Sequence, residues 1–214
     1  MSTQKMYDQW STTYDDVDNP TRDLEKRACK ATLSPLSFDS VIELGSGTGK
    51  NTEWLAERAV NVTCVDLSSE MQAIARAKVL RDNVRFVLGD IRDGWSFLEQ
   101  KADLITCSLI LEHVEKLDNV FRQAFSHLNK NGHLYICELH PFKQYSGSKA
   151  RFESGGELHV LDCYLHHVTD YTEAAANDGF ILEQMTEWFD KQDRSDIPRL
   201  ISFLFKRERK DETS

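Results

Sequence analysis

Residues 43–49, Glu43-Leu44-Gly45-Ser46-Gly47-Thr48-Gly49, connect a short β-branched run at 40–42 to a segment with helical spacing at 50–59. This order predicts a buried strand, a tight turn and a helix. Three glycines at alternate positions leave out the Cβ atoms that would keep a ligand away from the backbone. The free N–H groups and positive dipole end of the helix point at the same place, so the turn can hold an anionic or electron-rich group. The alternative is a glycine-rich loop that binds nothing.

The chain after the turn alternates regularly between strand and helix patterns. Further strands are expected at residues 60–66, 84–88, 103–109 and 133–139, with helices at 68–80 and 117–128, and Asn131-Gly132 as the stop of the second helix. Strands separated by helices of this length predict a parallel sheet with right-handed crossovers. After a helix that begins at Thr169 or Asp170, the runs 180–189 and 199–206 predict an antiparallel pair at the edge of the sheet.

Composition narrows the kind of partner. The 214 residues fit one domain, and a net charge of −9 gives no basic footprint for nucleic acid, so we expect a small-molecule partner. The five cysteines are far apart and form no CxxC pair, which predicts neither a zinc site nor a disulfide framework. Residues 1–10 lack the apolar core of a signal peptide, and no apolar run is long enough to cross a membrane. We therefore expect a cytoplasmic monomer or homodimer without a bound metal.

Two flanking segments differ from this regular core. Near the N-terminus, Tyr7, Trp10 and Tyr14 share one face if residues 4–15 are helical, and this face either packs on the domain or covers a flat ligand. Residues 140–167 form an irregular segment of about thirty residues, a length usual for functional loops. We expect this segment to cover the substrate, and the charged tail beyond Arg207 to fray.

Four groups of residues together resemble the class I S-adenosylmethionine-dependent methyltransferases: Glu43-x-Gly45-x-Gly47-x-Gly49, Asp66 after the second strand, Gly89-Asp90-Ile91 after the third, and Glu112-His113 after the fourth. The resemblance covers residues 38–140. It implies an α/β doubly wound, seven-stranded mixed sheet in the order 3-2-1-4-5-7-6, with the last strand antiparallel and helices on both faces. It also implies one methyltransferase domain over residues 1–214, with a helical lid at 1–36 and an acceptor-side insertion at 140–168.

The resemblance implies S-adenosylmethionine as the cofactor. The glycine turn would lie against its methionine part, Asp66 would bind both ribose hydroxyls, and Asp90 would bind the adenine amino group. The full implied cofactor set is Tyr14, Glu43, Gly45, Gly47, Gly49, Asp66, Leu67, Met71, Asp90, Ile91 and Ser108. Independently of the resemblance, a carboxylate accepts two hydrogen bonds side by side, which matches a vicinal diol. The alternatives are a helix N-cap for Asp66 and a simple turn residue for Asp90.

Two other classes share some of these features. Nicotinamide-dependent dehydrogenases have a strand, a glycine turn and an acidic residue, but their spacing is G-x-G-x-x-G, and here the third glycine comes one position early. A catalytically idle subunit that only binds the cofactor would retain the same turn. We therefore expect an enzyme that methylates an oxygen or nitrogen atom of a small-molecule acceptor, with these two classes as alternatives.

Histidine is the first candidate for a base that takes a proton from such an acceptor near neutral pH. His113 and His140 follow central strands at their carboxyl ends and are the expected catalytic residues. In the insertion, the expected acceptor-binding residues are Phe142, Tyr145, Tyr164 and His166. Ser108 stands where a catechol-type magnesium site would need an aspartate, which is a further reason to expect no metal.

Overall fold

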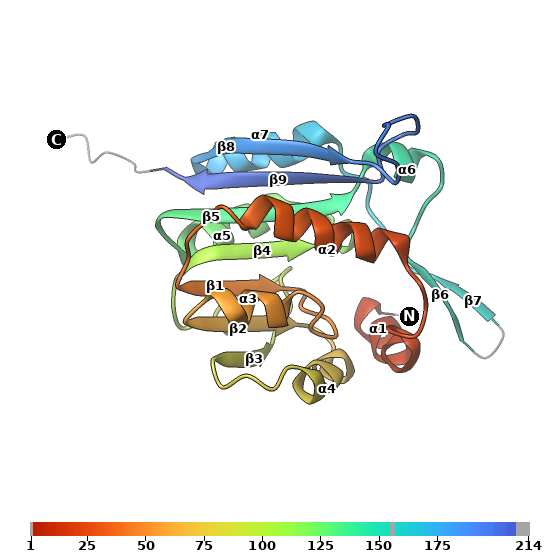
Figure 1. Cartoon of the computed structure of the whole chain (residues 1–214), viewed down its shortest axis with the longest axis horizontal. Helices are drawn as coiled ribbons and strands as arrows, with labels where there is room; N and C mark the ends of the chain where they lie inside the picture. The colour runs from red at the N-terminus through yellow and green to blue at the C-terminus, as the bar shows by residue number, and fades with distance from the viewer. Residues whose placement is uncertain (1, 155–156, 209–214) are drawn as a thin grey trace.

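The computed structural model describes residues 2–154 and 157–208, and its centre is a seven-stranded sheet (Figure 1). The sheet has the order β3-β2-β1-β4-β5-β9-β8, and β9 runs antiparallel to both of its neighbours. Numbered along the chain within this sheet, the order is 3-2-1-4-5-7-6, so the predicted topology is confirmed. The strands are β1 Ser40–Leu44, β2 Asn61–Asp66, β3 Val84–Leu88, β4 Ala102–Ser108, β5 Leu128–Leu139, β8 Phe180–Trp188 and β9 Leu200–Arg207.

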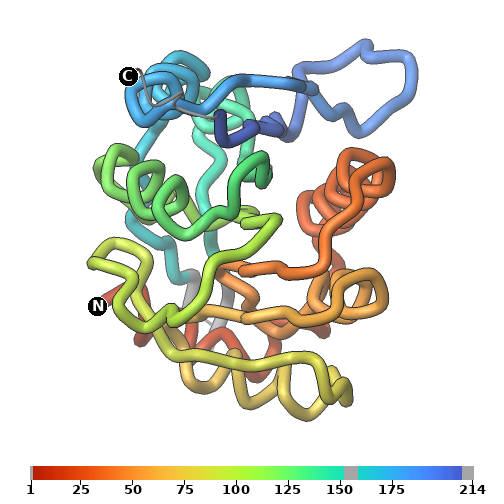
Figure 2. The backbone as a smooth tube through the Cα atoms, turned by 90° about the vertical axis from the view of Figure 1, so that its left-hand side faces the viewer, coloured from red at the N-terminus to blue at the C-terminus, as the bar shows by residue number. Residues whose placement is uncertain are grey.

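Helices cover both faces of the sheet, because successive residues of its central strands point to opposite sides. Val41 and Leu104 pack on one face against α2 (Pro20–Leu33) and α3 (Thr52–Arg58). Their neighbours Ile42 and Ile105 pack on the other face against α5 (Asp118–His127) and α7 (Val168–Asp178). Figure 2 shows these two helix layers on either side of the strands. Each such fully buried aliphatic side chain contributes about 1.5–3 kcal/mol to folding.

The chain between β4 and β5 differs from its prediction. Helix α5 ends at His127, and β5 begins at Leu128, which pairs with Ala102. Asn131, with φ +63°, and Gly132 therefore lie inside a strand, where the register shifts, instead of ending a helix. A Cβ atom on Gly132 would lie 2.9 Å from the backbone oxygen of Asp103, so the close approach of two strands requires this glycine.

The N-terminal flanking segment is largely helical, as expected, whereas the second flanking segment contains regular structure that was not expected. The N-terminal segment forms α1 (Thr3–Trp10) and a 3₁₀ turn, η1 (Ser11–Thr13), and α4 (Ser69–Lys78) lies beside it (Figure 1). The segment expected to be irregular holds a short helix, α6 (Pro141–Tyr145), and a hairpin of β6 (Arg151–Ser154) and β7 (Glu157–Val160). Helix α7 begins at Val168, with Asp170 as its capping partner. The prediction for the tail, residues 209–214, lies outside the described residues.

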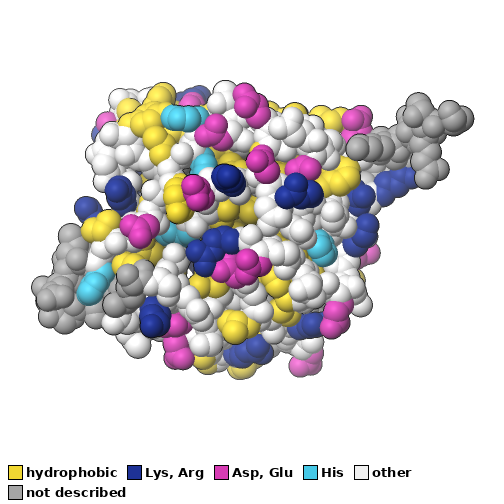
Figure 3. Space-filling model, turned by 180° about the vertical axis from the view of Figure 1, so that it is seen from behind, with side chains coloured by type: hydrophobic (Ala, Val, Ile, Leu, Met, Phe, Trp, Pro, Cys, Tyr) yellow, Lys and Arg dark blue, Asp and Glu magenta, His cyan; other side chains and the backbone are white. Residues whose placement is uncertain are grey.

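The surface carries charged side chains of both signs (Figure 3). On the face shown in Figure 3, basic side chains are interspersed with acidic ones and, among the residues coloured there, form no large basic patch. Among the described helices, none combines the length and the apolar character that a bilayer span requires.

Candidate functional site

A pocket that is partly open to solvent lies beyond the carboxyl ends of β1, β2 and β4. The strand order reverses between β1 and β4, and an open α/β sheet leaves a crevice at such a point. Five segments line the pocket: the glycine turn, the ends of β2, β3 and β4, and the N-terminal residues Thr3, Tyr7, Tyr14, Arg22 and Glu25. Ten of the eleven predicted cofactor residues line it: Tyr14, Glu43, Gly45, Gly47, Asp66, Leu67, Met71, Asp90, Ile91 and Ser108.

The glycines of the turn have separate tasks. Gly45, with φ +66°, lies against Ile110, whose Cγ2 would be 2.3 Å from a Cβ atom at this position. Gly47, with φ +52°, faces open space, because nothing lies within 4 Å of the place a Cβ would occupy. Gly49 is the one predicted cofactor residue outside the pocket lining, and it packs against Val79 at the end of α4.

Asp66 joins the glycine turn to the start of α4. Its two carboxylate oxygens accept hydrogen bonds from Gly47 N and Ser68 N, each at 2.8 Å. The side chain is buried, and this burial raises its pKa. The N-cap of α4 is Ser68, whose Oγ accepts from Met71 N, so Asp66 is not the cap. Each carboxylate oxygen still has lone-pair capacity on the pocket side.

Asp90 has a different environment from Asp66. Its carboxylate forms a two-oxygen ion pair with Arg92, at 2.5 to 3.0 Å, and this hydrogen bonding lowers the pKa of Asp90. Ile91 is buried beside it in the pocket wall. The carboxylate thus already has a partner on one side, and the apolar wall next to it suits the face of a planar ring.

Glu43 is buried at the base of the turn. Its Oε2 accepts from Thr52 Oγ1 at 2.5 Å, which ties β1 to the start of α3. Burial raises the pKa of Glu43 to about 7. This carboxyl group therefore supports the turn as well as lining the pocket.

A polar cluster that the sequence did not reveal lies where α2 meets the pocket. Asn51 Nδ2 donates to both carboxylate oxygens of Glu25, at 3.0 and 3.1 Å. Arg22 donates to the backbone oxygens of Tyr14 and Val17. Within the described residues, three buried atoms of this region have no hydrogen-bond partner: Arg22 Nε, Asn51 Oδ1 and Ser108 Oγ. Because buried polar groups are normally bonded, these atoms indicate a place for a polar ligand.

The polar cluster had one signal in the sequence. Arg22 and Glu25 are charged, are three residues apart, and occupy the face of the predicted helix that also carries the buried Cys29. Charged side chains on an apolar helix face indicate a function or a buried pair.

The wall after β4 has an unusual backbone. Leu109 has φ +57°, a conformation that side chains rarely adopt. Glu138 of β5 supports this turn, because its Oε1 accepts from both Ile110 N and Leu111 N at 3.0 Å. Burial raises the pKa of Glu138 to about 8.

The N-terminal segment is fixed across the mouth of the pocket by side-chain hydrogen bonds. Asp8 accepts from Ser68 Oγ at 2.5 Å, and Asp15 accepts from Thr48 Oγ1 at 2.8 Å. Of the three predicted aromatic residues, Trp10 is buried against Met71, whereas the other two line the pocket. The aromatic face therefore packs on the domain through Trp10 and lines the pocket through the other two rings.

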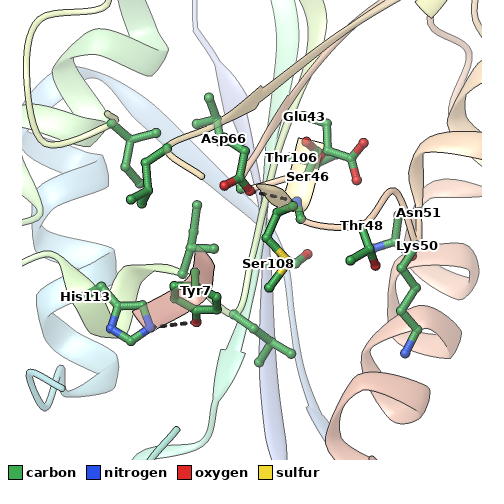
Figure 4. Close-up of a pocket in the computed structure, with 18 of the residues that line it drawn as sticks. Tyr7, Glu43, Ser46, Thr48, Lys50, Asn51, Asp66, Thr106, Ser108 and His113 are labelled. Carbon is green, nitrogen blue, oxygen red and sulfur yellow. Dashed lines mark hydrogen bonds between the residues drawn. The ribbon is translucent and has the colours of Figure 1, made fainter. Parts of the chain in front are cut away.

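The two candidate histidines lie in different places. His113 follows β4 on a 3₁₀ turn, η2 (Leu111–His113), lines the pocket, and bonds Tyr7 Oη through Nε2 at 2.9 Å (Figure 4). His140 lies outside the pocket lining and is buried between the end of β5 and β8. Its Nε2 is 3.3 Å from Glu187 Oε1, and burial lowers its pKa.

The structure does not bring the four predicted acceptor-binding residues into the pocket lining. Phe142, Tyr145 and Tyr164 are about half exposed at the surface. Tyr145 Oη pairs with His167 Nδ1 at 2.5 Å. His166 is buried and donates through Nε2 to backbone oxygens of residues 111 and 114, so it anchors the segment that carries His113. Apolar content showed that this segment is ordered but not which way its side chains face.

Comparison with known proteins finds methyltransferases that are similar to this chain. Residues 42–136 match the family model described as a methyltransferase domain. The chain is 27% identical over 171 residues to a malonyl-[acyl-carrier protein] O-methyltransferase of Priestia megaterium, covering 76% of this chain and 56% of the relative. It is 31% identical over 120 residues to a demethylmenaquinone methyltransferase of Tropheryma whipplei, covering 54% of this chain and 48% of the relative. The chain thus spans about half the length of these curated relatives.

Solved structures share the fold. The N-methyltransferase NodS of Bradyrhizobium japonicum, in complex with S-adenosyl-L-homocysteine, superposes with a TM-score of 0.74 at 15% identity. That match covers 98% of this chain and 100% of NodS.

Proposed function

We propose that this chain, whose residues 42–136 match a methyltransferase domain, is a class I S-adenosylmethionine-dependent methyltransferase that transfers a methyl group to an oxygen or nitrogen atom of a small molecule. The observation that carries the proposal is Asp66, a buried carboxylate held by Gly47 and Ser68 in the same pocket wall as the glycine turn. Its remaining lone pairs match the two hydroxyls of a ribose.

The rest of the pocket fits the two ends of S-adenosylmethionine. We place the adenine beside Asp90 and Ile91, where the wall is apolar. The methionine end is zwitterionic and needs both donors and acceptors. Arg22 Nε can donate to its carboxylate, while Asn51 Oδ1 and the Glu25 carboxylate can accept from its ammonium group. Arg22 Nε and Asn51 Oδ1 otherwise lack hydrogen-bond partners, so a bound zwitterion satisfies them.

Methyl transfer is a displacement in which an acceptor lone pair attacks the methyl carbon while the carbon–sulfur bond breaks, and the bond's electron pair goes to sulfur. The cofactor supplies the electrophilic methyl group. The protein must align the acceptor and exclude water. The N-terminal lid, residues 1–36, serves the second need because its contacts with Thr48 and Ser68 close the mouth. The insertion, residues 140–168, supports the acceptor side through Asp162, whose backbone oxygen holds His113. His113 is the better placed of the two candidate bases.

Calorimetry with S-adenosylhomocysteine, S-adenosylmethionine and NAD tests the proposal. We expect both adenosyl ligands to bind and NAD to bind at least tenfold more weakly. Replacing Asp66 with Asn removes the charge-assisted bond to ribose, worth about 1.5–3 kcal/mol, and should weaken binding about tenfold or more. Asp82→Asn, at an exposed position far from the pocket, is the matched control. A folded Asp66→Asn protein with unchanged affinity would refute the ribose assignment, and binding without methyl transfer to any acceptor would indicate an idle subunit.

A further inference from the structure

Both ring nitrogens of His113 are occupied. Nδ1 lies 3.1 Å from the backbone oxygen of Asp162, and Nε2 lies 2.9 Å from Tyr7 Oη. A carbonyl oxygen can only accept, so the neutral ring carries its proton on Nδ1. Nε2 is then the acceptor, and Tyr7 donates its hydroxyl proton to it. An incoming substrate therefore cannot reach a free nitrogen of His113 while the N-terminal lid is closed.

The Tyr7 hydroxyl oxygen can contact an acceptor in the pocket, whereas the ring nitrogens of His113 cannot. Tyr7 lines the pocket from α1, and its oxygen donates one hydrogen bond, to His113. A phenolic oxygen that donates still has lone pairs that accept. Burial raises the pKa of Tyr7 well above its usual value, so the phenol stays protonated and retains this donor bond. The ring is held in place by stacking on Trp10, with centroids 5.8 Å apart.

A buried carboxylate lies behind the pair. Glu112 Oε1 is 3.9 Å from His113 Nε2, and Glu112 Oε2 is buried without a hydrogen-bond partner among the described residues. The nearby Cys163 thiol is neutral, because burial, together with the Glu112 charge, raises its pKa to about 12. An imidazolium formed at His113 would thus lie beside a buried carboxylate, and their attraction favours proton transfer to His113.

We propose that Tyr7 is the catalytic residue that contacts the acceptor, and that it relays the acceptor's proton to His113. The proposal rests on the proposed function. As the acceptor atom attacks the methyl carbon, its own O–H or N–H bond breaks and that proton passes to Tyr7 Oη. The Tyr7 proton moves at the same time to His113 Nε2, which becomes an imidazolium and later releases the proton to solvent. His113 and Glu112 act through Tyr7 and are positioning residues.

This relay specifies a class of acceptor. A hydroxyl or an amine has a proton to give, and an uncharged group of this kind donates to the Tyr7 oxygen. A carboxylate or thiolate has no proton to relay, and its lone pairs would face the lone pairs of Tyr7 across a partly desolvated site. We therefore assign the acceptor to neutral hydroxyl or amine compounds.

A first test needs no acceptor. Long-range ¹H–¹⁵N NMR of the histidine rings, with the His113→Gln protein for assignment, reports which nitrogen carries the proton. We expect the Nδ1–H form, both with and without S-adenosylhomocysteine, and a changed Nε2 shift in Tyr7→Phe, which removes the hydroxyl and retains the ring. The Nε2–H form, or an unchanged shift in Tyr7→Phe, would overturn the relay.

A second test measures turnover of S-adenosylmethionine with a library of small compounds sorted into hydroxyls, amines, thiols and carboxylic acids. Tyr7→Phe and His113→Gln should each lower kcat about 100-fold or more, the usual contribution of positioned proton transfer, with S-adenosylhomocysteine affinity changed less than threefold. The double variant should lose no more than either single variant, because the two residues act as one unit.

Control measurements distinguish a failure of the Tyr7–His113 relay from a failure of the proposed function. Tyr171→Phe removes a hydroxyl from a buried tyrosine of α7 outside the pocket and should leave kcat unchanged. A loss below threefold in Tyr7→Phe, or faster methylation of thiols or carboxylic acids than of hydroxyls and amines, would overturn the relay. A wild-type protein that does not bind S-adenosylhomocysteine would instead refute the proposed function and leave the NMR result to judge the hydrogen-bonded pair.

Discussion

Replacing Glu138 with Gln should make the protein's stability less dependent on pH. Two opposing effects act on this carboxyl group. Burial raises its pKa, whereas hydrogen bonds from Leu111 N and Ile110 N favour the ionised form, and burial prevails to give a pKa of about 8. Gln has nearly the same shape, and its amide oxygen can accept both backbone bonds. The variant therefore removes the ionisation and keeps the support of the pocket wall.

The size of the effect follows from the pKa. A carboxyl group whose pKa rises on folding stabilises the protein fully below the unfolded pKa, and this stability is lost as pH rises through the folded pKa. For Glu138 these values are 4.5 and about 8. Each state has a proton-binding polynomial, and the stability depends on the ratio of the folded to the unfolded one. Between pH 6 and pH 8 the base-10 logarithm of this ratio falls by about 1.7. At 1.36 kcal/mol per logarithmic unit, the wild type loses about 2 kcal/mol.

Urea unfolding at pH 6, 7 and 8 measures this loss. The free energy of unfolding of Glu138→Gln should fall by about 2 kcal/mol less than that of the wild type over this range, and Glu138→Ala, which loses both backbone bonds, should be less stable than Gln at every pH. Glu173→Gln, at an exposed position of α7, is the matched control and should follow the wild type. A Glu138→Gln protein with the wild-type pH dependence would show that the two N–H groups keep Glu138 ionised, and the reasoning from burial would be wrong.

Two further predictions concern the lid and the insertion. Asp15→Asn weakens the contacts with Thr48 and Lys78 that hold the lid closed, and it should speed the release of S-adenosylhomocysteine several-fold in stopped-flow measurements; an unchanged rate would mean that the lid is not the barrier to exit. Phe142→Ala and Tyr164→Ala alter exposed residues outside the pocket lining, so S-adenosylhomocysteine affinity measured by calorimetry should change less than threefold, and a larger loss would place the insertion in the cofactor site.

The sheet could be predicted from the sequence because its signals are local. The glycine turn and the regular strand–helix alternation sufficed for the parallel core and its antiparallel edge pair, and each depends on residues within one strand–helix unit. The strand order itself came from the family resemblance. The fold differs from its prediction where distant residues decide the outcome. Gly132 reads as a helix stop, but it is needed where Asp103 of a neighbouring strand comes close, and no local pattern reports that approach.

The residues of the candidate site also fall into two groups, those that the sequence could place in the pocket and those that it could not. Asp66 could be placed in the pocket because it ends the strand that follows the glycine-turn unit, and the structure pairs this strand in parallel with β1. Arg22 and Glu25 could not, because the rotation of α2 about its axis depends on how the whole helix packs. His140 and His113 look alike in sequence, since each follows a central strand, yet one side chain turns toward β8 and the other into the pocket. The path of the backbone after the end of the strand decides where each side chain points, and this path cannot be inferred from the residue type.

One short helix touches both halves of the pocket. Through Asp8 it reaches Ser68, next to the proposed cofactor side, and through Tyr7 it reaches His113, on the proposed acceptor side. Ordering this helix costs conformational entropy, and the first ligand to bind meets this cost. The second ligand then binds to a helix that is already ordered, so each ligand should increase the affinity of the other by the same factor. Cooperative, ordered entry of two different molecules can thus arise from a single eight-residue helix, without any movement of the sheet.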